Sequence, residues 1–304
     1  MTKPNAHIWE WNGLNVAWNL EESKNESPIS IVLIHGFGAC KEHWRNNQRF
    51  CGEISPCYAI DLIGFGESSQ PKARLHNELI EKNNFFYCFE NWSQQIADFC
   101  AEIVKKPVLL IGNSIGGIIA IRASQLLQNK CVGLVLIDCA QRTMDDKRLS
   151  EQPIGMQILR PILKSLVKQR VFSQNIFKAV ARPFFIEKFL NIAYPTKNNL
   201  NAGLINMLYK PTQREGASEA FRGFINLFND YLAPELLKDV NNVKVDLIWG
   251  EKDPWEPLEE ANKWFKSIRN IQSLKIIKGC GHCPHDENPK EVNKVLLEII
   301  QQAI

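Results

Sequence analysis

The stretch LLIGNSIGGIIA, residues 109–120, decides the fold of this chain, because it ends an apolar run with one serine set between glycines. A buried strand is expected over 107–112 and a helix over 115–128, so the chain must turn from strand to helix around Ser114. A turn this sharp crowds the backbone two residues before and two residues after the serine, which explains the glycine at both places. The turn exposes the Ser114 hydroxyl at the strand end and places its backbone at the positive end of the helix dipole.

Apolar runs elsewhere in the chain predict the rest of a mostly parallel sheet. Runs without polar alternation indicate strands buried on both faces, and the helical patterns between them indicate helices that cover the sheet. The expected strands are 29–34, 57–62, 107–112, 132–138, 244–250 and 273–279, and the expected helices are 90–104, 115–128, 258–268 and 289–304. Strands that alternate with helices predict an α/β fold with right-handed crossovers. Near the N-terminus, Asn12-Gly13 predicts a tight turn between two antiparallel strands.

The strand pattern stops between about residue 140 and residue 233. This stretch predicts several short helices, among them 155–169 and 197–210, separated by prolines. These prolines are Pro153, Pro161, Pro183, Pro195 and Pro211. We therefore expect a core formed by residues 1–139 and 234–304, interrupted by an all-helical lid over 140–233.

A serine hydroxyl is a weak nucleophile at neutral pH, so Ser114 needs a base that a third group orients. Two segments beyond the helical stretch supply these groups at expected strand ends: WGEKDP contains Asp253, and KGCGHCPH contains His282. The chain order serine, aspartate, histidine is typical of the nucleophile elbow, and open parallel sheets place their sites at the carboxyl ends of strands. We predict a triad of Ser114, Asp253 and His282, with Asp138, at the end of the strand 132–138, as the alternative acid.

The loop HGFG, residues 35–38, follows an expected strand and predicts an oxyanion hole. Negative charge develops on the carbonyl oxygen that a serine attacks, and backbone N–H groups aimed at that oxygen stabilise it. We expect the N–H groups of Phe37 and Ile115 to converge there. His35 is expected to order this loop, with no role as a titrating group.

Other polar motifs are interpreted as structural. The loop DLIGFGESSQP, residues 61–71, contains a G-x-G pattern, but that pattern alone is weak support for phosphate binding and favours a turn. The cluster CGHCPH, residues 280–285, has the residue types of a zinc site. A closed zinc site needs a second ligand pair, and the chain has no other CxxC or HxxxH. His285 is expected to hold the loop after His282 in place, and we predict no metal and no organic cofactor.

The composition is that of an ordinary globular protein, with 45% hydrophobic and 23% charged residues among 304. The formal net charge of +3 is too small to predict a nucleic-acid partner. The N-terminus has no basic region followed by an apolar core, and no uncharged apolar run reaches the roughly 18 residues that span a bilayer. The nine cysteines are scattered, which favours reduced thiols. We expect a soluble, cytoplasmic protein that acts on a small molecule.

Taken together, the HGFG, GNSIGG, GEKDP and GCGH motifs resemble the alpha/beta hydrolase family over nearly the whole chain. The segments YCFENWSQQIADF, EGASEAFRGFINLF and GHCPHDENP look like the cyanobacterial and chloroplast branch that includes pheophytinases, which hydrolyse the phytyl ester of pheophytin. The resemblance implies the alpha/beta hydrolase fold, the triad named above and a helical lid over 140–233. Haloalkane dehalogenases and epoxide hydrolases of similar fold carry an aspartate at the elbow, so Ser114 argues against both activities. Carbon-carbon bond hydrolases of meta-cleavage products share the GNSxGG elbow, so this activity is kept as an alternative.

These residues predict a serine hydrolase that cleaves a bulky, apolar carboxylic ester through an acyl-enzyme. The alternatives are a carbon-carbon bond hydrolase or perhydrolase with the same triad, and a non-catalytic receptor that binds a small ligand under its lid. Residues 140–213 contain 12 Lys and Arg against 4 Asp and Glu, interleaved with apolar residues. A basic and apolar lid predicts either peripheral contact with an anionic membrane or a solvated basic face. The oligomeric state is left open.

Overall fold

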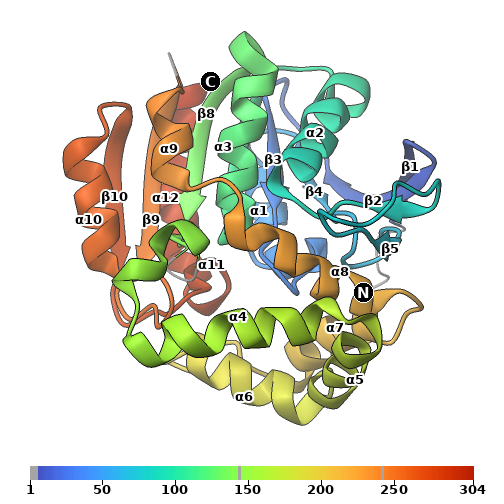
Figure 1. Cartoon of the computed structure of the whole chain (residues 1–304). Helices are drawn as coiled ribbons and strands as arrows, with labels where there is room; N and C mark the ends of the chain where they lie inside the picture. Colours follow the sequence, from blue (N-terminus) through green and yellow to red (C-terminus); the bar gives the residue numbers. More distant parts are fainter. Residues whose placement is uncertain (1–5, 143–144, 241–242) are drawn as a thin grey trace.

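The computed structural model describes residues 6–142, 145–240 and 243–304, and an eight-stranded sheet forms its centre (Figure 1). The strands lie in the order β1-β2-β4-β3-β7-β8-β9-β10. Their bounds are β1 (His7–Trp11), β2 (Leu14–Glu21), β3 (Ser30–Ile34), β4 (Cys57–Ile60), β7 (Val108–Asn113), β8 (Cys131–Ile137), β9 (Lys244–Gly250) and β10 (Ile271–Ile277). The β1-β2 and β2-β4 pairs are antiparallel, and every other neighbouring pair is parallel. The mostly parallel sheet expected from the sequence is confirmed.

The central strands are apolar at consecutive positions because helices cover both faces of the sheet. In β3, Val32 and Ile34 belong to the core cluster on one face, and Ile31 and Leu33 belong to the cluster on the other. All four side chains are fully buried. Since successive side chains of a strand point to opposite faces, a strand covered on both sides has no position for a polar residue.

Two layers of helices flank the sheet (Figure 1). One layer contains α2 (Phe89–Phe99), α3 (Ile115–Leu127), α9 (Ala233–Lys238) and α10 (Leu258–Ser267), and the other contains α1 (Gln48–Gly52) and α12 (Pro289–Ala303). The helix expected over 90–104 is α-helical only as far as Phe99 and continues as a π-helical turn, Cys100–Val104. That turn ends at Lys105, whose φ of 59° is left-handed and cannot continue a right-handed helix.

The predicted N-terminal hairpin is confirmed. Asn12 has φ of 50° and Gly13 has φ of 75°, and the adjoining Trp11 and Leu14 are paired across β1 and β2. Positive φ at both turn residues matches the right-handed twist of the flanking strands, which is why Asn-Gly suits this turn.

The structure differs from the sequence prediction in the length of one strand and in one additional pair of strands. The strand expected over 57–62 ends at Ile60, although the Asp61 N–H still donates to the Ala17 carbonyl of β2 at 2.8 Å. The Asp61 side chain accepts hydrogen bonds from the N–H groups of Lys41 (2.7 Å) and Glu67 (2.8 Å). A separate two-stranded pair, β5 (Lys72–Ala73) with β6 (Asn84–Phe85), was not expected. Strands of two residues are too short to show an apolar pattern.

Helices fill the chain between β8 and β9, and no strand occurs in the described part of this segment. They are the 3-10 helix η4 (Asp146–Glu151), α4 (Ile154–Lys168), α5 (Arg170–Val180), α6 (Pro183–Ala193), α7 (Ala202–Thr212), α8 (Ala217–Gly223), the 3-10 helix η5 (Phe224–Asn229) and α9. Figure 1 shows α4 to α7 beyond the arrowheads of β8 and β9, at the carboxyl edge of the sheet. Across the described ranges, no helix is both long and apolar enough to cross a bilayer.

The prolines of this segment separate helices at only three of the five expected places. Pro153 precedes α4, Pro183 begins α6 and Pro195 follows α6, but Pro161 lies inside α4 and Pro211 lies inside α7.

The α4 helix continues through Pro161 because the same neighbours hold the residues on both sides of it. Arg160 and Lys164 each pair with Asp146, at 2.9 and 2.6 Å, and each lies over the ring of Phe228. These contacts offset the hydrogen bond that a proline removes from a helix.

Candidate active site

The turn at Ser114 has a conformation that few residues other than glycine adopt. Ser114 has φ of 56° and ψ of −122°, between the last residue of β7 and the first residue of α3. A Cβ on Gly112 would lie 2.2 Å from the Gly116 carbonyl oxygen, and a Cβ on Gly116 would lie 2.4 Å from the Ile34 carbonyl oxygen. A strained backbone persists only where its surroundings hold it. Here the Ser114 N–H donates to the Ile137 carbonyl at 3.0 Å.

The side chain of Ser114 does not cap α3, although it stands at the N-cap position. Its hydroxyl is therefore not used to satisfy the first N–H groups of the helix, which leaves it for another partner. The helix that begins at Ile115 directs its positive end toward this oxygen and favours the negative charge of an attacking alkoxide.

Asp253 and His282 meet at the carboxyl edge of the sheet, where each follows a strand. Asp253 comes after β9 and His282 after β10, and His282 Nδ1 lies 2.7 Å from Asp253 Oδ2. The other oxygen of Asp253 accepts hydrogen bonds from the N–H groups of Trp255 (2.8 Å) and Glu256 (3.1 Å). One imidazole and two backbone N–H groups therefore fix the orientation of the Asp253 carboxylate.

Electrostatics favour an ionised Asp253. Burial alone would raise the pKa of this carboxyl, but the interactions with His282, together with the hydrogen bonds from the Trp255 N–H and Asp138, lower the pKa below its ordinary value. An ionised Asp253 accepts the proton of Nδ1, so Nε2 keeps the lone pair that can take a proton from a hydroxyl.

The residue before Ser114 connects the serine turn to the histidine loop. The side-chain amide of Asn113 donates to the carbonyl oxygen of Ile137 (3.1 Å) and to that of His282 (3.2 Å). The ring of Trp255 lies against the imidazole, with 4.9 Å between ring centroids. The structure therefore brings all three predicted triad positions to one edge of the sheet.

Asp138, the alternative acid, has a different partner. It follows β8, is fully buried, and accepts a hydrogen bond from the Gly250 N–H at 2.9 Å. Burial, and then the negative charge of Asp253, raise the pKa of Asp138 well above its ordinary value. The raised pKa favours the protonated form of Asp138, and the hydrogen bond to His282 belongs to Asp253.

A third carboxyl beside the site, Glu256, was missed in the sequence. Burial raises the pKa of Glu256 to about 7, and its side chain accepts a hydrogen bond from the Gln141 N–H at 2.6 Å. The signal available in the sequence was a second carboxyl in the segment DPWEP, since Glu256 follows Asp253 by three residues. Nothing in the sequence indicates that this glutamate is partly buried.

The predicted oxyanion loop passes directly beside Ser114. A Cβ on Gly36 would lie 3.1 Å from the Ser114 Cβ. Among the described residues, neither the Phe37 N–H nor the Ile115 N–H has a backbone acceptor. Both groups are thus available to a substrate oxygen.

The side chain of His35 connects this loop to the segment that follows β4. Its Nδ1 lies 2.7 Å from the Gly36 carbonyl oxygen, and its Nε2 accepts from the Leu62 N–H at 3.1 Å. Burial lowers the pKa of His35 to about 4, so the ring is neutral at physiological pH. A neutral ring with both nitrogens bonded orders the loop.

The glycine-rich loop after β4 encloses a buried carboxylate. The Asp61 side chain accepts from Lys41 Nζ at 3.0 Å, and both side chains are fully buried. A Cβ on Gly66, where φ is 55°, would lie 2.2 Å from the Asp61 carboxyl. This glycine is therefore explained by an internal contact.

The cysteines and His285 of the segment 280–285 are buried and pack against other parts of the protein. Cys280 and Cys283 are buried free thiols, and the ring of His285 lies between those of Trp44 (4.5 Å) and His43 (4.8 Å). Within the part of the chain that the structure describes, no three His, Cys, Asp or Glu side chains are grouped so as to hold a metal.

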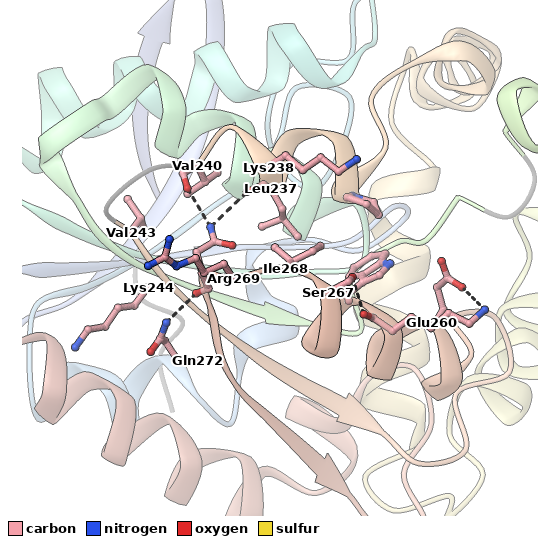
Figure 2. Close-up of a pocket in the computed structure, with 14 residues that line it drawn as sticks. Leu237, Lys238, Val240, Val243, Lys244, Glu260, Ser267, Ile268, Arg269 and Gln272 are labelled. Atoms are coloured by element: carbon pink, nitrogen blue, oxygen red, sulfur yellow. Dashed lines mark hydrogen bonds and ion pairs between the residues drawn. The ribbon is translucent and has the colours of Figure 1, made fainter.

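A hollow of about 1030 Å³ lies at the opposite edge of the sheet (Figure 2). Figure 2 shows Leu237, Val240, Val243, Lys244, Ile268 and Gln272 around it. These residues stand at the amino ends of β9 and β10, whereas Asp253 and His282 follow the carboxyl ends of the same strands. A strand of seven residues separates the two places by about 20 Å. This hollow is not part of the candidate active site.

The fold and the elbow define the class of the protein: the chain belongs to the alpha/beta hydrolase family, whose family model matches residues 31–295. It is 24% identical to the chloroplastic pheophytinase of Arabidopsis thaliana over 313 residues, which cover 94% of this chain and 64% of that protein. It is 23% identical to YugF, an uncharacterised hydrolase of Bacillus subtilis (strain 168), over 95% of this chain and 96% of that protein. The expected resemblance to pheophytinases is confirmed, although the chain spans less than two thirds of the Arabidopsis protein.

The solved structures agree on the fold. The epoxide hydrolase CorEH superposes with a TM-score of 0.78 at 17% identity, and the match covers 99% of both chains. A likeness at this level of identity shows the shared alpha/beta hydrolase fold and nothing about the substrate.

Replacing Gly112 by alanine tests the crowding at the elbow. The new Cβ would lie 2.2 Å from a backbone oxygen, which cannot rotate away, so we expect the free energy of unfolding to fall by about 1–3 kcal/mol. Gly155→Ala is the matched control, because a Cβ there meets no atom within 4 Å and alanine is the better helix former in α4. Urea unfolding compares the two, and wild-type stability in Gly112→Ala would contradict the crowding.

Replacing Asp138 by asparagine tests its protonation. The folded pKa of Asp138 is raised, so the stability it contributes is complete below its unfolded pKa, about 4, and is lost as the pH rises. Asparagine has no such proton to lose and keeps an oxygen for the Gly250 N–H. We expect the unfolding free energy of Asp138→Asn, relative to wild type, to increase from about pH 4 to pH 7 in urea titrations. Parallel pH profiles for the two proteins would show that Asp138 is ionised.

Proposed function

We propose that this chain is a serine hydrolase that cleaves a carboxylic ester through an acyl-enzyme. The observation that carries the proposal is the 2.7 Å contact between His282 Nδ1 and Asp253 Oδ2, at the sheet edge where the elbow presents Ser114. A serine at a strained turn, an imidazole and an ionised carboxylate are the three groups that nucleophilic acyl transfer requires.

In the proposed reaction, Ser114 Oγ attacks the ester carbonyl while His282 Nε2 takes the hydroxyl proton. The Phe37 and Ile115 N–H groups stabilise the oxyanion, and Asp253 stabilises the imidazolium. The C–O bond then breaks, and His282 gives the proton to the leaving alcohol. Water, activated by the same imidazole, attacks the acyl-enzyme and releases the acid. These residues complete the reaction without a metal or an organic cofactor.

The ester we propose is bulky and apolar. The helices between β8 and β9, which we propose to form a lid over residues 140–233, expose many large apolar side chains at the carboxyl edge of the sheet. The similarity to a protein named pheophytinase supports the same substrate class. The basic charge of these helices further supports peripheral contact with a membrane, and we propose a cytoplasmic location.

Carbon-carbon bond hydrolysis is the second candidate, because the GNSIGG elbow of residues 112–117 is shared with hydrolases of meta-cleavage products. The two functions differ in the bond that the enzyme breaks: a C–O bond in an ester or a C–C bond in a meta-cleavage product. Turnover of a panel of phytyl, acyl and aryl esters, beside a meta-cleavage product, separates them. Turnover of the meta-cleavage product alone would replace the ester hydrolase with the second candidate.

Replacing Ser114 by alanine tests the nucleophile. We expect turnover of a short chromogenic ester to fall by about a millionfold, since the acyl-enzyme cannot form. We also expect a fluorophosphonate probe to label the wild type and not the variant. The probe would not label a ligand-binding receptor without a reactive serine. Ser124→Ala is the matched control, because its hydroxyl donates to the Ile121 carbonyl within α3. Wild-type turnover by Ser114→Ala would refute the assignment.

Comparing Asp253→Asn with Asp138→Asn tests which carboxyl acts with His282. Asparagine at 253 cannot stabilise the imidazolium, so we expect kcat for the ester to fall by about 10⁴-fold. Asparagine at 138 keeps an oxygen for the Gly250 N–H and leaves the contact between Asp253 and His282 in place, so we expect most of the turnover to remain. The reverse order of the two losses would assign the acid to Asp138.

A further inference from the structure

The outer face of α6 (Pro183–Ala193) is apolar and exposed. Leu190 and Ala193 bury the inner face of this helix, with 4% and 2% exposure. The outer face carries large side chains that are about half exposed: Phe184 (58%), Phe185 (43%), Phe189 (58%) and Ile192 (56%). Positions 185, 189 and 192 follow helical spacing, so they form one stripe. A stripe of this kind on a protein in water indicates a surface that something else covers.

Basic side chains are frequent on α6 and in the segments next to it in the chain. Lys178, Arg182, Lys188 and Lys197 are exposed on or next to α6, against one exposed carboxylate, Glu187. Lys188 Nζ lies 4.4 Å from the centre of the Phe184 ring, so a cation stands directly beside the apolar face. Exposed apolar side chains together with exposed cations are complementary to a bilayer that carries anionic head groups.

The same helix is connected to the candidate active site. The ring of Phe189 stacks on Trp255 at 4.5 Å between centroids, and Trp255 lies against His282 at 4.9 Å. At the end of the helix, the Ala193 carbonyl oxygen accepts a hydrogen bond from the His282 N–H at 3.0 Å. Two aromatic contacts and one backbone hydrogen bond therefore link α6 to the residue that carries the imidazole.

A neighbouring helix adds to the apolar surface of this segment. On α4, Leu159, Ile162 and Leu163 are also about half exposed and follow helical spacing. Figure 1 shows α4 and α6 on the same side of the molecule, beyond the carboxyl edge of the sheet.

We propose that the outer face of α6 is a membrane-contact surface that binds an anionic bilayer and receives a lipid ester from it. The binding stands on the apolar and basic side chains alone, whereas the delivery of an ester rests on the proposed hydrolase function. The alternative occupant of the same face, a second copy of this chain, is distinguished by the experiment.

The experiment measures flotation with lipid vesicles in a Ser114→Ala background, so that no turnover takes place. We expect the protein to float with vesicles of phosphatidylcholine and phosphatidylglycerol at low salt, and to bind less at high salt. Phe184→Ser with Phe185→Ser is expected to weaken binding by about tenfold. Phe265→Ser is the matched control, because Phe265 is 41% exposed on α10 and is expected to bind as the parent does.

A charge variant provides a second readout that does not depend on the phenylalanines. Arg182→Glu with Lys188→Glu is expected to abolish binding to anionic vesicles at low salt. No flotation of the parent protein, or equal flotation of the phenylalanine pair and the Phe265 control, would overturn the proposal. A dimer that becomes a monomer in the Phe184, Phe185 variant, measured by light scattering, would assign the face to a second copy instead.

Turnover of a short, water-soluble ester by the protein with Ser114 intact is measured separately. Its absence, with flotation retained, would refute the hydrolase and leave the membrane surface standing. Its presence, with flotation absent, would refute the surface and leave the hydrolase standing.

Discussion

The structure depends on the close approach of backbone atoms around Ser114. Gly112 and Gly116 leave no space for a Cβ, since each would collide with a carbonyl oxygen at 2.2 and 2.4 Å. Their absence of side chains allows β7 to enter α3 in a single turn with Ser114 at positive φ. The hydrogen bond from Ser114 N–H to β8, and those from the Asn113 amide to β8 and the His282 carbonyl, then join the serine to neighbouring segments. The strained turn is therefore held by β8 and by the loop that carries His282.

Three carboxyls near the imidazole differ in pKa because their surroundings differ. Asp253 accepts a hydrogen bond from His282 and from two amides, and its pKa is lowered. Asp138 has one amide partner, is fully buried and faces the charge of Asp253, so its pKa is raised. Burial raises the pKa of Glu256 to about 7. Like charges that lie close together disfavour one another's ionisation, and the carboxylate that bonds the imidazole is the one whose pKa is lowered.

The helices between β8 and β9 combine a fixed end with an exposed outer face. Beside the Ala193 contact with the histidine loop, the Tyr194 hydroxyl donates to Asp286 at 3.0 Å, and the Thr196 N–H donates to Glu287 at 2.7 Å. Glu287 also accepts from the Gly281 N–H at 2.7 Å, next to His282. The end of α6 is thus bonded to the loop that carries the imidazole. The outer face of the same helix keeps its apolar side chains in water, which is the arrangement that a membrane contact requires.

The sequence by itself determined the α/β class, the N-terminal hairpin, the mostly parallel sheet and the residue types at the strand ends. These follow from local patterns: apolar runs, an Asn-Gly turn and glycines around one serine. Only the tertiary structure decided which carboxyl meets His282, the partial burial of Glu256, the passage of α4 through Pro161 and the exposed stripe on α6. Each of these depends on partners far apart in the chain, such as Asp138 with Gly250 or Ala193 with His282. A pKa and a burial are set by such neighbours, and spacing along the chain does not contain them.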